Sequence, residues 1–429
     1  MSKTLDKDLS HCSFCGRSID EVPLLLTGID GAICSDCAMN ANDVTEAHFK
    51  HHKANQSSNR KGNSPQADNL SKNDIPRPRE IKEFLDKYVI GQEDAKRTLS
   101  VAVYNHYKRL QNKETLSFGL SDDNVEIEKS NIIMLGPTGT GKTLLVRTIA
   151  RLLHVPFTIV DATVFTEAGY VGEDVESILS RLLQVCDYDE SQAARGIVFI
   201  DEIDKIARKQ DNPSLTREVG GEGVQQSLLK LLEGSIVNVP PKGGRKHPDQ
   251  EYVHLDTREI LFICGGAFEG LDRRIARRLG SRTVGYNSVH NTTRLNEEDL
   301  MRYVEPQDLR AFGLIPELVG RLPVITSLRP LDRVALKKIL IEPKNSIVKQ
   351  YTKLLAMDGI TLVFEESALD YIVEQALQYK LGARGLRSIT ERIMKEAMFD
   401  APDLTKEHAE LRITADYCRE QVQKDAPPC

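Results

Sequence analysis

The sequence predicts an α/β fold, in which a parallel sheet flanked by helices is preceded by a zinc-binding module and followed by a small, mostly helical domain. Three observations predict it: short apolar runs rich in β-branched residues, helical spacing of apolar residues after position 330, and paired cysteines near the amino terminus. Such apolar runs are typical of strands buried on both faces, as in a parallel sheet. A chain of 429 residues exceeds one typical domain, so we expect two or three.

Four cysteines crowd the first 40 residues with the spacing C-x₂-C-x₁₈-C-x₂-C: Cys12, Cys15, Cys34 and Cys37. Each C-x₂-C pair points two thiolates at one position, and two pairs complete a tetrahedral Zn²⁺ site without an open position. Disulfides are the alternative, but a reducing compartment disfavours them. The adjacent His11 could compete as a ligand, although four cysteines already fill the shell. We therefore expect a structural zinc module over residues 1–50.

Composition sets further limits. Residues 51–76 are polar and nearly free of large apolar side chains, which predicts a flexible linker. The net charge of −6 gives no electrostatic case for binding nucleic acid. No apolar run is long enough to span a membrane, and the first residues lack a signal core, so we expect a cytoplasmic protein that does not bind membranes.

The large domain is predicted over residues 77–327. Strands are expected at 131–135, 196–200 and 260–264, where apolar residues run without interruption. Between the first strand and a helical pattern lies a phosphate-binding loop, G-x-x-x-x-G-K-T, which predicts binding of ATP and Mg²⁺. Its backbone N–H groups would face the phosphates, the lysine would contact them, and the threonine hydroxyl would face Mg²⁺. The loop consists of Gly136, Pro137, Thr138, Gly139, Thr140, Gly141, Lys142 and Thr143.

Two adjacent acids follow the second predicted strand. Asp201 is expected near the metal, and Glu202 is expected to polarise the attacking water. Two acids after a strand could equally begin a solvated helix. Their pairing with a complete phosphate-binding loop favours the catalytic interpretation.

The pattern changes after Pro330, and a small helical domain is predicted over residues 328–417. Apolar residues recur at helical spacing over 331–355 and 367–378, with an extended stretch at 360–364 between them. Residues 418–429 are expected to form a polar tail.

Together these features resemble the AAA+ protein unfoldases, and within them the type that works with a ClpP-type peptidase. The resemblance covers nearly the whole chain, because the zinc module, linker, ATPase domain and helical domain occur in the family's order. Five shorter motifs also match. They contain the adenine-side Val89 and Ile90, the pore-loop Tyr170 and Val171, the pore-entrance Arg245, Lys246 and His247, the arginine finger Arg321, and the second nucleotide sensor Arg384.

The resemblance implies an ATP-driven motor that unfolds protein substrates, works as a homo-hexamer, and uses its zinc module for dimerisation and for adaptors. The loop that would dock the peptidase reads Val284-Gly285-Tyr286, where the family usually has Ile-Gly-Phe. An apolar tip can still enter a hydrophobic cleft, but the tyrosine hydroxyl needs a partner or water. Peptidase docking is therefore the implied role whose residues differ most clearly from the family pattern.

Several alternatives stay open on the residues alone. Each short motif could be an exposed turn, a surface charge or a helix-start arginine. A remodelling chaperone without a peptidase, or a DNA-directed AAA+ motor, would share the ATPase core. The second is disfavoured because the zinc module is apolar between its cysteines and contains one arginine, Arg17. An unfoldase with a domain inserted between its nucleotide motifs is excluded, because Lys142 and Asp201 are too close in sequence.

Overall fold

A computed structural model describes residues 11–27, 31–41, 75–117, 125, 127–166, 173–207, 221–239, 252–281, 297–379, 382–403 and 410–424. The chain forms two compact units, Met1–Ala67 and Asp68–Cys429.

The first unit contains the four paired cysteines. A short 3-10 helix, η1 (Ile19–Glu21), leads to β1 (Leu25–Thr27) and β2 (Ala32–Cys34), which pair antiparallel with Leu26 opposite Ile33. Residues 35–41 are helical. Among the described residues, the small core of this unit consists of Cys12, Val22 and Cys34, and large apolar side chains such as Phe14, Leu24 and Leu26 are exposed.

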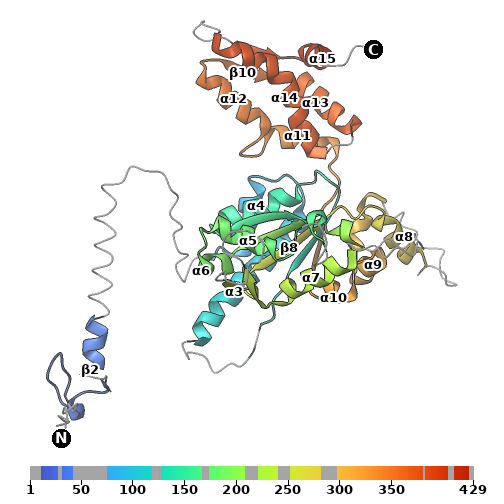
Figure 1. Cartoon of the computed structure of the whole chain (residues 1–429). Helices are drawn as coiled ribbons and strands as arrows, with labels where there is room; N and C mark the ends of the chain where they lie inside the picture. Colours follow the sequence, from blue (N-terminus) through green and yellow to red (C-terminus); the bar gives the residue numbers. More distant parts are fainter. Residues whose placement is uncertain are drawn as a thin grey trace, which may run out of the picture. The chain divides into compact units, whose positions relative to one another are not determined.

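The second unit is built on a parallel five-stranded sheet with the strand order β4-β5-β8-β3-β9. Figure 1 labels β8, the central strand, among the helices of this unit. The predicted parallel sheet is confirmed, and the three predicted strands form β3 (Ile132–Leu135), β5 (Ile197–Asp201) and β8 (Leu261–Gly266). The sequence interpretation missed β4 (Phe157–Asp161) and β9 (Val324–Ser327). Both border the sheet, where one side is not paired with a further strand, and both mix polar with apolar residues, so neither forms an uninterrupted apolar run.

Alternating side chains of the strands build two separate cores. Ile132 and Met134 of β3 face a core with three helices, whereas Ile133 and Leu135 face a larger core on the other side. This alternation follows from the two-residue period of a strand. The helices of the first face are α2 (Pro78–Asp86), α3 (Glu93–Ser117) and α4 (Lys142–Leu153).

The opposite face carries more elements. They are η2 (Ala162–Val164), α5 (Ser177–Val185), α6 (Glu190–Ala194), η3 (Ile203–Ile206), α7 (Gly221–Glu233), α8 (Leu271–Ser281), η4 (Glu297–Tyr303), α9 (Pro306–Phe312) and α10 (Pro316–Gly320). An antiparallel hairpin of β6 (Ile236–Val239) and β7 (Val253–Asp256) adjoins them. The sheet is therefore covered on both faces by apolar cores.

The carboxyl-terminal part is mostly helical, as predicted. Its elements are α11 (Arg333–Ile341), α12 (Ile347–Met357), β10 (Thr361–Phe364), α13 (Glu366–Gln378), α14 (Gly382–Asp400), η5 (Ala401–Asp403), β11 (Glu410–Ile413) and α15 (Ala415–Lys424), with β10 and β11 parallel. The predicted helical run 331–355 is interrupted, because Pro343 follows α11 and Ser346 caps the start of α12.

The expected polar tail differs from the structure. Instead of leaving the domain, residues 415–424 form α15, and Cys418 is fully buried in the same core as α13 and α14. The helix was missed because few of its side chains are apolar: Cys418 is buried, and Tyr417 and Val422 pack partly buried against the same core. Within the described residues, no helix is both long and apolar enough to cross a lipid bilayer.

Candidate functional site: a nucleotide site and a metal centre

The phosphate-binding loop follows β3 and ends where α4 begins. Gly141 precedes the helix with φ of 102°, a backbone conformation that favours glycine and turns the first N–H groups of α4 toward the loop. The helix has 12 residues, so its amino terminus carries a partial positive charge. The loop thus offers donors and a favourable field to an anion.

Lys142 is the first residue of α4 and its side chain is largely buried. Its Nζ donates to the carbonyl oxygens of Gly136 at 2.5 Å and Pro137 at 3.1 Å. Burial lowers the pKa of Lys142, opposed by the charges of Asp201, Asp204 and Glu202. The ammonium group of Lys142 lies at the loop, where it can exchange these carbonyl acceptors for phosphate oxygens.

The two acids after β5 reach the same place. The hydroxyl Oγ1 of Thr143 donates to Oδ2 of Asp201 at 3.4 Å, and Oδ1 of Asp201 accepts from the backbone N–H of Glu202 at 3.0 Å. Glu202 itself has φ of 58°, an unfavourable conformation for a residue with a side chain. Such backbone strain persists where the surroundings fix it and is concentrated at functional sites.

A third acid of this segment, Asp204, was not among the predicted site residues. It is buried, and its Oδ1 accepts from the backbone N–H of Ala267 at 3.1 Å, which joins the end of β5 to the end of β8. Its charge also acts on Lys142. The signal in the sequence was the spacing Asp201-Glu202-Ile203-Asp204, in which a third carboxylate follows the same strand.

The helical domain contributes Arg384 to the same region. The preceding residue, Ala383, donates its backbone N–H to the carbonyl oxygen of Gly139 at 3.4 Å. This bond holds the start of α14 against the loop, and the charge of Arg384 contributes to the lowered pKa of Lys142. Arg384 itself is exposed, so it is available to a ligand.

The predicted adenine-side residues lie between α2 and α3. Val89 is buried in the same core as α4, and Ile90 is partly exposed. The neighbouring Tyr88 stacks under the guanidinium of Arg151, 4.2 Å from the ring centroid. This segment therefore packs against the helix that begins at the phosphate-binding loop.

Arg321 follows the carboxyl end of α10, and its side chain is half exposed. Its Nε and Nη2 donate to Oε1 of Glu233 at 3.2 and 3.0 Å. Its backbone carbonyl accepts from the amide of Asn131, which also donates to the carbonyl of Leu232. The structure thus fixes the backbone of Arg321 and orients its side chain through Glu233, a partner that the sequence interpretation did not predict.

The predicted metal ligands come together in the first unit. One ligand atom from each of Cys12, Cys15, Cys34 and Cys37 lies within 4.8 Å of the others. Backbone N–H groups of Cys34 and Cys37 donate to the sulfurs of Cys12 and Cys34 at 3.2 and 3.5 Å. Burial opposes ionisation of Cys12, but backbone donors overcome it and lower the pKa of this thiol to about 6.

The remaining predicted residues lie outside the described parts of the chain. These are the pore-loop residues Tyr170 and Val171, the cluster Arg245, Lys246 and His247, and the docking residues Val284, Gly285 and Tyr286.

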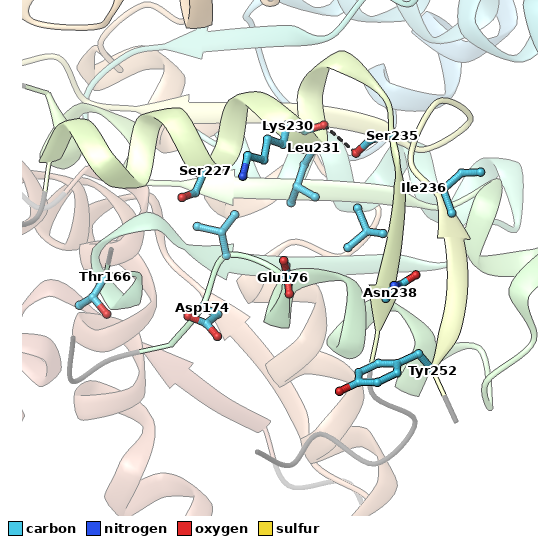
Figure 2. A pocket seen from close by; sticks show the side chains of 12 residues that line it. Thr166, Asp174, Glu176, Ser227, Lys230, Leu231, Ser235, Ile236, Asn238 and Tyr252 are labelled. Atoms are coloured by element: carbon cyan, nitrogen blue, oxygen red, sulfur yellow. Dashed lines mark hydrogen bonds between the residues drawn. The ribbon is translucent and has the colours of Figure 1, made fainter. Parts of the chain in front are cut away.

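A cavity of about 520 Å³ lies beside the roots of two of these loops (Figure 2). Thr166 and Asp174 border the segment that contains Tyr170, and Asn238 and Tyr252 border the segment that contains Arg245. Lys230 of α7 forms part of the wall, and its carbonyl accepts from Ser235 Oγ at 3.1 Å. Described residues next to both predicted substrate segments therefore line one cavity.

Three family models match separate parts of the chain. Residues 10–47 match a ClpX C4-type zinc finger, residues 127–325 an AAA domain (Cdc48 subfamily), and residues 331–412 the C-terminal, D2-small domain of ClpB protein. None of the three matched regions is a peptidase domain.

Curated relatives match the chain along its length. A protein of Bacteroides thetaiotaomicron named ATP-dependent Clp protease ATP-binding subunit ClpX is 60% identical over 97% of both chains. A protein of the same name from Porphyromonas gingivalis is 59% identical over 96% of this chain and 98% of its own.

The residues present fit the cofactors of this family. Four sulfurs that face one another and accept backbone N–H groups suit a closed Zn²⁺ site. The glycine-rich loop, the buried Lys142 and the Thr143–Asp201 pair suit ATP with Mg²⁺. Since both the sites and the full-length relatives agree, the chain belongs to the ClpX family, the AAA+ ATP-binding subunits of the ATP-dependent Clp protease.

Proposed function

We propose that this ATPase unfolds protein substrates and translocates them into a separate ClpP-type peptidase. The observation that carries the proposal is the convergence of Lys142, the acids after β5 and the lid residue Arg384 on one loop. It occurs in a chain about as long as relatives named as ATP-binding subunits of a Clp protease. Bound ATP with Mg²⁺ supplies a phosphoryl group that water can attack.

The chain's own groups have separate roles in this proposal. Lys142 leaves the carbonyls of Gly136 and Pro137 and binds phosphate oxygens, while Asp201 holds Thr143 in place for the metal side. Glu202 orients and polarises water, and Arg384 binds phosphate from the lid. Val89 and Ile90 contact the base.

A homo-hexamer completes each site. Arg321 is exposed and its backbone is fixed by Asn131, so it can present a guanidinium to the nucleotide of a neighbouring subunit as an arginine finger. Breaking its half-exposed ion pair with Glu233 costs no more than about 1 kcal/mol, so the pair does not prevent Arg321 from reaching that nucleotide.

The cavity between the loop roots supports the substrate-handling part. The loops with Tyr170 and Val171, and with Arg245, Lys246 and His247, begin at walls that include Lys230 of α7. A movement of α7 would therefore reach both loops. The aromatic and β-branched pair would grip chains of unrelated sequence, and the basic cluster would attract a free carboxylate.

The zinc module is proposed as a site of dimerisation and of adaptor binding. Phe14, Ile19, Leu24 and Leu26 are exposed on it, more apolar surface than so small a unit can bury by itself. Apolar exposure of this kind marks a protein contact and does not suit phosphate contact, which disfavours the DNA-directed alternative.

Degradation of a stably folded, tagged protein tests the proposal. With the purified chain, ATP and a ClpP-type peptidase, the substrate should disappear, and Glu202→Gln should instead retain it bound without degradation. Loss of substrate without ATP, or equal loss with Glu202→Gln, would contradict the proposal.

A second candidate is a remodelling chaperone that works without a peptidase. The observation that favours it is the tripeptide Val284-Gly285-Tyr286 in the docking position. It predicts ATP-dependent unfolding of the same substrate with no binding of the peptidase. Replacing Val284 and Tyr286 with Ile and Phe would then restore binding.

A further inference from the structure

We propose that Gln92 is a positioning residue that couples the adenine-side segment to the connection between the large and the helical domains. This connection is Leu328-Arg329-Pro330, which follows β9 and precedes α11. The hydrolysis experiment below depends on the proposed role of Arg384, whereas the hydrogen-exchange experiment does not.

The contact consists of two reciprocal hydrogen bonds. Nε2 of Gln92 donates to the carbonyl oxygen of Arg329 at 2.8 Å, and the backbone N–H of Arg329 donates to Oε1 of Gln92 at 2.8 Å. The two residues are 237 positions apart, and Gln92 is 8% exposed. One amide side chain thus satisfies both backbone groups of a residue in the connection, as a neighbouring strand would.

The backbone conformation of Gln92 is strained, which indicates that its side chain is needed for this contact. Its φ is 61°, a conformation that costs energy for a residue with a side chain. Its carbonyl nevertheless accepts the first bond of α3, from the N–H of Lys96 at 2.9 Å. A strained residue at a helix start persists when its side chain is needed in one direction.

The other side of the connection touches the phosphate-binding loop. The N–H of Leu328 donates to the carbonyl of Leu135 at 2.7 Å. A Cβ at Gly136 would lie 2.9 Å from both Cβ and the carbonyl oxygen of Leu328, so only glycine allows this approach. The connection is therefore held between the first residue of the phosphate-binding loop and Gln92, two residues after Ile90.

Two further hydrogen bonds cross between the domains and report on this arrangement. The N–H of Lys344 donates to the carbonyl oxygen of Lys87 at 2.8 Å, and the N–H of Ala383 donates to the carbonyl oxygen of Gly139 at 3.4 Å. Neither involves Gln92. If Gln92 positions the helical domain, both bonds should open more often without it.

Amide hydrogen exchange of the full-length chain with ATP and Mg²⁺ tests this. Gln92→Ala should speed exchange at Lys344 and Ala383 by about tenfold, the effect of losing two modest hydrogen bonds, and leave β3 and β8 protected. Gln307→Ala is the control, because among the described residues this exposed glutamine bonds to Glu305 of its own segment. Unchanged exchange at Lys344 and Ala383 would overturn the proposal.

Gln92→Glu tests the same proposal if the alanine variant folds poorly. Its carboxylate still accepts from the N–H of Arg329 but offers no donor to the carbonyl, so exchange at the two amides should rise about threefold.

Hydrolysis distinguishes positioning from a general structural role. Gln92→Ala should lower ATP turnover, but should lower it little further in an Arg384→Ala background, because both changes remove the same group from the phosphates. Equal fold losses in the two backgrounds would overturn a role through Arg384. If Arg384→Ala alone turned over ATP normally, the proposed role of Arg384 would fail, and the exchange result would still decide the role of Gln92.

Discussion

At the scale of single residues, the nucleotide site separates binding from chemistry. Lys142 is buried and bonded to loop carbonyls, so its role requires an anion to replace them. Glu202 has no such contact with the loop, and its strained backbone follows the strand that carries Asp201. The two side chains can therefore be tested independently.

Lys142→Ala should abolish binding of ATP, because it removes the buried ammonium that donates to the loop carbonyls. Glu202→Gln should keep binding and lose hydrolysis by a factor of about 10² or more, since a water-polarising group is lost while the shape stays. Nucleotide binding by fluorescence and turnover by phosphate release, measured on both variants, check this. Turnover of Glu202→Gln within a few-fold of the unchanged chain would refute its assignment.

His106 gives a prediction about stability. It is buried on α3, where the backbone of Glu259 raises the pKa of the imidazole less than its other surroundings lower it. Burial, together with the charges of Arg109 and Lys129, lowers the pKa of His106 from its usual value of 6.5 to about 3. The unfolded chain therefore binds more protons between these values, and stability falls as the pH falls from about 6.5 to about 3.

His106→Phe should remove this loss, on the order of a few kcal/mol at the acid end, and shift the midpoint of acid unfolding to lower pH. Helical circular dichroism against pH measures it. His154→Asn is the control, because His154 is exposed and has φ of 52°, which asparagine tolerates. If both variants unfolded at the same pH as the unchanged chain, the buried imidazole would not contribute.

At the scale of elements, the sequence predicted best where one physical signal dominates. Uninterrupted apolar runs located β3, β5 and β8, and cysteine spacing located the metal centre. Strand β4 is interrupted by Thr158 and half of β9 is polar, so their short patterns do not stand out from loops. The contacts of Gln92 with Arg329, and of Arg321 with Glu233, join distant positions and have no local signal.

The zinc module should lose its fold when its metal is removed, because its core contains few apolar side chains and thiolate ligation supplies most of its folding free energy. A zinc-selective chelator should release one Zn²⁺ per chain and expose residues 11–41 to proteolysis. Hydrolysis of ATP should persist, since the nucleotide contacts lie in the second unit.

Cys12→Ser should reproduce the effect of the chelator. The control is Cys186→Ser, because Cys186 is buried outside the module and donates to the carbonyl of Leu182. Protection of residues 11–41 that survives complete loss of zinc would contradict a structural metal.

At the scale of the whole molecule, the proposed motor must transmit hydrolysis from the sheet edge to a substrate. The described structure offers one path, because the last turn of α7 combines three contacts. Lys230 lines the cavity at the loop roots, the carbonyl of Leu232 accepts from Asn131 at the start of the β3 strand, and Glu233 holds Arg321. A change at a neighbouring nucleotide that engages Arg321 would thus reach the base of the loop with Tyr170.

Tyr170→Ala tests the end of this path. Turnover of ATP should survive, because the loop is expected to touch no phosphate, whereas unfolding of a stable tagged substrate should fall at least about tenfold through lost apolar contact area. Both rates are measured on one preparation. A joint fall would assign Tyr170 to the catalytic or structural machinery. If neither rate fell, the gripping role of the segment between Thr166 and Asp174 would have to be abandoned, and substrate would have to be held by the basic cluster alone.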